Sequence, residues 1–94
     1  MEGLYPALRI KGGIIRTFMK TDPGTYAIAI EKPTSEMGAP LVDVNLYGTL
    51  IVLDEGLSKR QVYFDDYKGL FTRGYDAGAQ KWRNWYKLSY QRVE

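Results

Sequence analysis

The sequence predicts a mainly β fold: a small antiparallel sheet or partly closed barrel, OB-like or SH3-like, of about five to six strands with at most one short helix. Glycine and proline recur about every 8 to 16 residues, which leaves segments too short for most helices. Apolar and polar residues alternate within several of these segments, which is typical of half-buried strands. Together these features favour strands joined by turns.

The chain of 94 residues is long enough for one hydrophobic core, so residues 1–94 are predicted to form a single β-rich domain. Its 45% apolar and 26% charged residues are typical of a globular protein. Met1–Pro6 lacks the pattern of a secretory signal. The longest apolar run, Leu50–Leu53, is far shorter than the roughly 20 residues that cross a bilayer. We therefore expect a soluble, cytoplasmic protein without a membrane partner.

The first strands are predicted around Gly12–Gly13. Residues 8–11 alternate apolar and basic side chains, and the alternation changes phase after the two glycines. A Gly-Gly hairpin explains the change, and a bulged single strand explains it almost as well. The face expected to turn inward after the glycines consists of Ile15, Thr17 and Met19. In the hairpin Arg9 stands opposite Arg16, so the two side chains either extend into water or face an anionic ligand.

The middle of the chain predicts two strands separated by a loop. Thr25–Glu31 alternates cleanly, and Lys32–Pro40 has the prolines and polar residues of a mobile loop. Leu41–Leu53 is the strongest strand signal, and its last five residues are apolar on both faces, which is typical of a central strand. Gly48 predicts a bulge or a sharp bend within it.

The last third predicts two further strands. Arg60–Phe64 is the first, and Asp65–Lys81 is expected to be irregular, with one helical turn around Asp66–Leu70. The aromatic residues of Trp82–Val93 favour a strand. A helix remains the alternative there, because several of the apolar residues also have helical spacing.

The sequence contains neither cysteine nor histidine. This excludes cysteine nucleophiles, thiolate metal sites and histidine-based catalytic triads. Adjacent carboxylates such as Asp54–Glu55 and Asp65–Asp66 point to opposite faces of a strand, so solvated turns are favoured over a metal site. We expect a protein that is not an enzyme and that holds no cofactor or metal.

Charge and aromatic residues are concentrated in the last third. Residues 59–94 carry eight basic and four acidic side chains, whereas residues 1–58 carry five and seven. The same segment holds nine of the thirteen aromatic residues. Cations that contact phosphates and rings that stack on bases are the features by which proteins bind single-stranded nucleic acid. Aromatic residues also fill strand cores, and a cation beside a tryptophan can form an intramolecular contact.

If Trp82–Val93 is one regular strand, Trp82, Tyr86, Leu88 and Tyr90 share the core face. The opposite face then presents Trp85 among three cations. The predicted binding residues are Arg9, Arg16, Lys81, Arg83, Trp85, Lys87 and Arg92.

Two functions fit this surface. The first hypothesis is a module that binds single-stranded nucleic acid. The alternative is a protein-interaction module, such as an inhibitor, adaptor or assembly subunit, because Trp, Tyr and Arg also dominate protein interfaces. An exposed strand edge or apolar patch would also support a homo-oligomer.

Overall fold

The computed structural model describes residues 14–56, 58–88 and 93. These residues form one sheet of seven strands, whose path follows the chain from β1 to β6, while β7 pairs with β5. The strands are β1 (Ile14–Ile15), β2 (Gly24–Ile30), β3 (Leu46–Asp54), β4 (Lys59–Asp65), β5 (Gly69–Asp76), β6 (Lys81–Trp82) and β7 (Tyr86–Leu88), and a 3₁₀ turn covers Ser35–Met37. The predicted fold class is confirmed: the protein is mainly β, with a small, barrel-like sheet.

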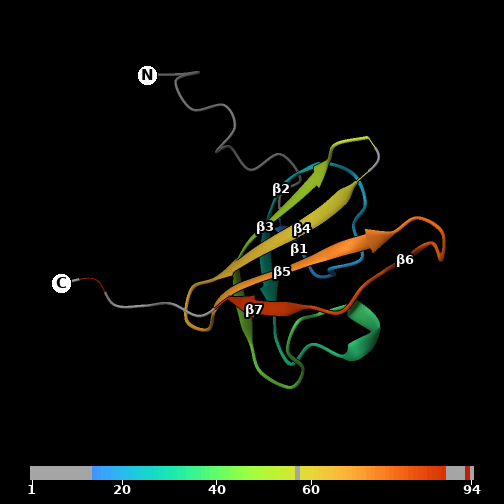
Figure 1. The fold of residues 1–94 in the computed structure, drawn as a ribbon. Coiled ribbons are helices and arrows are strands. Elements are labelled where there is room, and N and C mark those ends of the chain that lie inside the picture. The colour runs from blue at the N-terminus through green and yellow to red at the C-terminus, as the bar shows by residue number, and fades with distance from the viewer. Residues whose placement is uncertain (1–13, 57, 89–92, 94) are drawn as a thin grey trace.

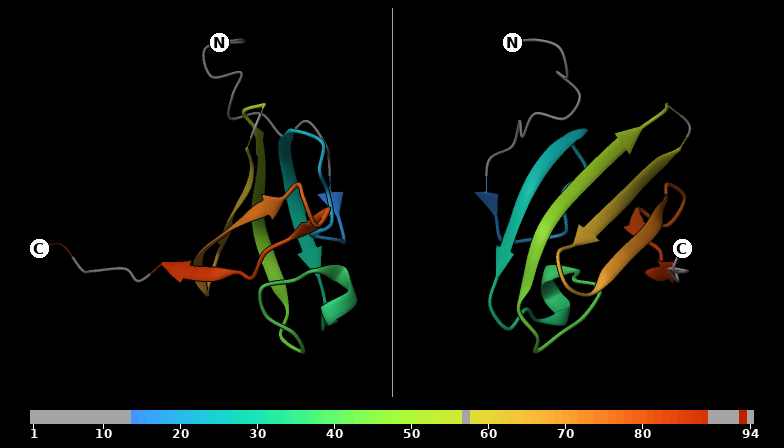
Figure 2. Two further views of the ribbon diagram at one scale, coloured as in Figure 1. Left: turned by 45° about the vertical axis from the view of Figure 1, so that its right-hand side comes forward. Right: turned by 90° about the vertical axis from the view of Figure 1, so that its left-hand side faces the viewer.

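The sheet is antiparallel from β2 to β7, and only the short β1 pairs in parallel, with β2. Figure 1 shows β5 and β7 in front of β2, and Figure 2 shows the same sheet curled into a half-barrel. The curl gives the sheet a concave inner side and a convex outer side. No helix among the described residues is long and apolar enough to cross a membrane.

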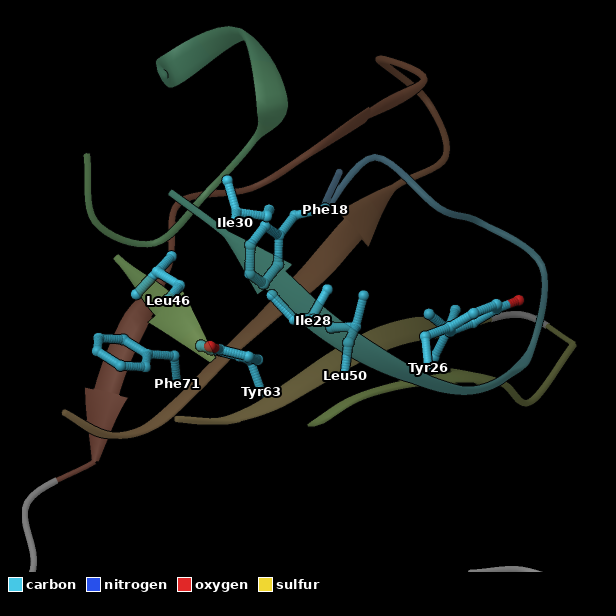
Figure 3. Close-up of a cluster of buried hydrophobic side chains, with 9 residues drawn as sticks. Phe18, Tyr26, Ile28, Ile30, Leu46, Leu50, Tyr63 and Phe71 are labelled. Carbon is cyan, nitrogen blue, oxygen red and sulfur yellow. The ribbon is translucent and has the colours of Figure 1, made fainter. Parts of the chain in front are cut away.

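The inner side of the sheet holds the hydrophobic core. Its central row runs across the strands through Tyr26, Leu50, Tyr63 and Phe71, which lie opposite one another in the strand register. Figure 3 shows these rings and aliphatic side chains converging on one another. Tyr63 is fully buried, and its ring lies edge-on to that of Phe18, with 4.9 Å between centroids. The alternation predicted for β2 is confirmed, since Tyr26, Ile28 and Ile30 are all buried.

The segment that follows β1 covers this inner side instead of extending the strand. The predicted inward face is confirmed for Ile15, which packs against the core, but was wrong further along: Met19 is 52% exposed, whereas Phe18 is completely buried. The cause is local, because the Met19 N–H donates to Oγ1 of Thr17 and the Phe18 N–H donates to the Met37 carbonyl. These bonds turn the chain across the sheet. The predicted partner strand at 8–11, and Arg9 with it, lies outside the described residues.

The long strand predicted at Leu41–Leu53 begins only at Leu46. Asp43 has a positive φ of 61° and its N–H donates to the Pro33 carbonyl, so the chain bends there and leaves Val42 exposed. The bulge predicted at Gly48 was also wrong, since the register with β2 and β4 is continuous through it. Gly48 instead permits a close approach, because a Cβ there would lie 1.9 Å from the Phe64 carbonyl oxygen.

The segment Asp65–Lys81, predicted to be irregular, contains the full strand β5. The helical turn predicted at Asp66–Leu70 is a tight turn between β4 and β5. Asp65 organises it: its carboxylate accepts hydrogen bonds from the backbone N–H groups of Tyr67 and Lys68. Pairing with β4 over six residues outweighs the glycines and the charged side chain that interrupt β5.

Candidate interaction surface

The structure does not bring the predicted binding residues to one face. Lys81, Arg83 and Lys87 are exposed near the last two strands. Arg16 is exposed too, but it lines a separate, shallow pocket of about 450 Å³ with Glu31 and Tyr47. Arg92, like Arg9, lies outside the described residues. The cations therefore divide between different parts of the molecule.

Trp85 faces inward, which corrects the predicted arrangement of the last strand. Its indole N–H donates to the Gly38 carbonyl at 2.7 Å, and its ring lies edge-on to Phe18. It is half-buried and packs against the core. Tyr86, predicted to lie in the core, is 69% exposed. The face expected to centre on Trp85 is thus not present.

A change of register explains this reversal. Trp82 pairs with Tyr75, whereas Tyr86 pairs with Thr72, so four steps along the last segment match three steps along β5. The extra residue lies between Arg83, whose N–H still donates to the Gly74 carbonyl, and β7. One additional residue in a strand moves every later side chain to the opposite face. The helical alternative is wrong as well, since both parts of this segment are strands.

Arg73 is the cation that the two tryptophans contact. Its guanidinium carbon lies 4.9 Å from the ring centroid of Trp82 and 4.5 Å from that of Trp85. Its Nε donates to Oε1 of Gln61 and its Nη2 donates to the Phe18 carbonyl. Burial lowers the pKa of Arg73 to about 10, so the side chain remains a cation at neutral pH. This cluster of buried groups joins β4, β5 and the segments that cover the core.

The carboxylates considered for a metal site are bound within turns. Asp65 is 7% exposed and accepts a hydrogen bond from the Tyr63 hydroxyl at 2.6 Å, in addition to the backbone groups of its turn. Burial, followed by this hydrogen bond and the negative charge of Asp65, raises the pKa of Tyr63 above its ordinary value. Asp54 and Asp76 each accept from a backbone N–H two or three residues ahead. Within residues 14–56, 58–88 and 93, no group of three or more acidic residues is placed to hold a metal ion.

The convex side of the sheet carries a second apolar surface, which we call the outer face. Its side chains alternate with the inward ones along β3, β4 and β5, continue onto β7, and lie beside one another in the register. The outer face consists of Thr49, Ile51, Leu53, Arg60, Val62, Phe64, Leu70, Thr72, Tyr86 and Leu88.

Several of these side chains are strongly exposed. Phe64 is 43% exposed, Leu88 45% and Leu53 41%, although all three are large and apolar. Phe64, Leu70 and Leu88 form one continuous row across β4, β5 and β7. Neighbouring apolar side chains exposed in this way are typical of contact surfaces. The outer face is the strongest candidate site in the described part of the chain.

The sequence contains a pattern that indicates this surface, but that was used above only to predict a central strand. Thr49–Leu53 is apolar on both faces, and this pattern correctly predicts a central strand, since β3 lies between β2 and β4. A strand with two apolar faces also implies that both sides of the sheet are covered. Within the described residues, the core and its covering segments lie on the inner side alone.

Comparison of the chain with protein-family models, curated proteins and solved structures finds no match.

Proposed function

We propose that the chain is a non-catalytic protein-interaction module that contacts its partner through the outer face. One observation supports this most directly: Phe64, Tyr86 and Leu88 are large apolar or aromatic side chains that are between 43% and 69% exposed, on the two strands that flank β5. Aromatic residues in a mostly apolar patch with few charges are characteristic of the centre of a protein interface.

The charge of the outer face favours a protein partner over nucleic acid. Arg60 is its one charged side chain, at the end of the surface next to Leu53 and Gly74. A surface that binds nucleic acid carries several cations among its rings, because phosphate contacts supply most of the binding free energy. An apolar face with a charged rim instead matches the arrangement of protein interfaces.

Photo-cross-linking in the native cell tests the proposal. A benzophenone side chain replaces Phe64 in one variant and Glu36, which is exposed on the 3₁₀ turn beyond the inner side, in the control. We expect a discrete protein adduct from position 64 and none from position 36. The absence of an adduct at 64, or the same adducts from both positions, contradicts the proposal.

Binding of single-stranded nucleic acid is the second candidate function. The observation that favours it is the exposure of Lys81, Arg83 and Lys87 on and between the last two strands, together with the exposed ring of Tyr86 on β7. The test is the fluorescence anisotropy of a labelled oligonucleotide at several salt concentrations. The slope of log affinity against log salt concentration is negative, and it should become shallower by about 0.7 for each phosphate contact that a substitution to alanine removes. No binding at low salt excludes this candidate.

A further inference from the structure

We propose that the partner of the outer face is a second copy of this chain, bound face to face about a two-fold axis that runs across the strands. This inference rests on the proposed function and specifies its partner. The supporting feature is an arrangement along β4 that is complementary to itself. The side chains at alternate positions are a cation, two apolar residues and an anion: Arg60, Val62, Phe64 and Asp66.

The two charges stand at opposite ends of β4, with Arg60 on the outer face and Asp66 just beyond it. Arg60 pairs with Leu53 on one side and Gly74 on the other, at the beginning of β4. Asp66 directly follows β4, and its N–H donates to the Tyr47 carbonyl at 2.8 Å, which continues the ladder with β3 by one residue. Both charged residues are exposed. The apolar rows of the outer face lie between them.

A two-fold axis perpendicular to β4, between Val62 and Phe64, superposes β4 on its own copy in the reverse direction. Arg60 then lies over Asp66 of the second copy, and Val62 over its Phe64. Each contact occurs twice, as symmetry requires of an isologous interface.

Other symmetric arrangements are disfavoured by charge. An axis along the strands through β4 would place Arg60 over Arg60 of the second copy. Antiparallel pairing of the two β7 edges, centred on the middle residue of the strand, would place Lys87 opposite its own copy. Like charges placed directly opposite each other destabilise strand pairs. A cation on an edge strand is also a usual means of preventing such pairing.

Sedimentation equilibrium of the full chain tests the proposal, with circular dichroism to confirm that each variant is folded. We expect a reversible dimer, and Phe64→Glu should weaken it by at least about a hundredfold, because it buries a carboxylate in an apolar interface. Arg60→Asp and Asp66→Arg should each weaken it by about tenfold, since each change replaces two attractive pairs by repulsive ones. The control Lys87→Asp makes the same change of charge at a residue of β7 on the inner side, with its Nζ 5.9 Å from the Phe71 centroid, and should leave dimerisation unchanged.

The double variant Arg60→Asp/Asp66→Arg is the decisive measurement. It exchanges the two charges and should restore the wild-type affinity, a rescue that a misfolded protein cannot produce. A monomeric wild-type chain, or a double variant no better than the single ones, overturns the inference. The cross-linking experiment distinguishes a wrong partner from a wrong function, because it detects any protein bound at the outer face. An adduct of twice the chain mass supports the second copy, another mass supports a different partner, and no adduct contradicts both.

Discussion

The two sides of the sheet differ much less in composition than in what covers them. Along β3, Leu50 and Val52 point inward and are almost fully buried, while Leu53, on the outward side, is 41% exposed. Phe71 on the inner side is 2% exposed, and Phe64 on the outer side is 43% exposed. Apolar side chains of similar size therefore occupy both surfaces.

The cover on the inner side comes from segments that do not belong to the long strands. Phe18 and Trp85 pack over the core. Gln61 and Arg73 both donate hydrogen bonds to the Phe18 carbonyl, and the Arg73 guanidinium lies over the Trp85 ring. Within the described residues, one face is thus completed by covering segments, while the other has the composition of a core and no such cover. Substitutions on the two sides test that difference.

The largest contrast is expected between neighbouring residues of β3. Leu50→Ala should lower the free energy of unfolding by about 2 to 5 kcal/mol, because it leaves a cavity in a filled core. Ile51→Ala, one position along, should cost less than about 1.5 kcal/mol, since its side chain is only half-buried. Urea unfolding at low protein concentration measures both. Equal losses would show that the outer face is as well covered as the inner one.

Removal of the buried cation should have the next largest effect. Arg73→Ala leaves Oε1 of Gln61 and the Phe18 carbonyl without this donor, and should cost about 3 kcal/mol. The emission of Trp85 should shift to the red as its surroundings loosen. Arg83→Ala is the control, because Arg83 is exposed and lies 3.7 Å from Asp76, and it should change stability by less than about 0.5 kcal/mol. Similar losses for the two variants would argue against a structural role for Arg73.

The smallest expected effect is on the pH dependence of stability and concerns the phenol of Tyr63 on the inner side. Because the pKa of Tyr63 is raised in the folded state, its contribution to stability is complete below pH 10 and decreases as the unfolded state loses its proton above that pH. Above pH 10, the free energy of unfolding should therefore decrease less steeply with pH in Tyr63→Phe than in the wild type, by up to about 1.4 kcal/mol per pH unit. Tyr86→Phe on the outer face, which removes an exposed hydroxyl, should keep the wild-type slope. Parallel slopes for wild type and Tyr63→Phe would contradict this account.

The sequence predicts those parts of the fold whose alternation is regular. β2 and β4 lie within one residue of the predicted bounds, because the large side chains of β2 alternate regularly and β4 contains the β-branched and aromatic run Val62–Phe64. β5 could not be recognised, because its inward position 73 is an arginine and Gly69 and Gly74 resemble turn residues. The burial of that arginine depends on Gln61 and two tryptophans, which lie far from it in the chain.

The candidate site was less predictable than the fold. Counting alternate positions assumes one register, and the extra residue before β7 exchanges the expected positions of Trp85 and Tyr86. The apolar character of both sides of β3 is visible in the sequence, but periodicity alone does not show that, among residues 14–56, 58–88 and 93, only one side is covered. That information comes from the path of the segment around Phe18.

The extra residue between β6 and β7 serves both surfaces at once. In a regular strand, residues three positions apart point in opposite directions, yet here Trp82 and Trp85 both reach Arg73. The same irregularity directs Tyr86 outward, beside Thr72. Evolutionary change at this point therefore cannot adjust the closure of the half-barrel without also altering the exposed surface, so insertions and deletions there should be under selection for both properties together.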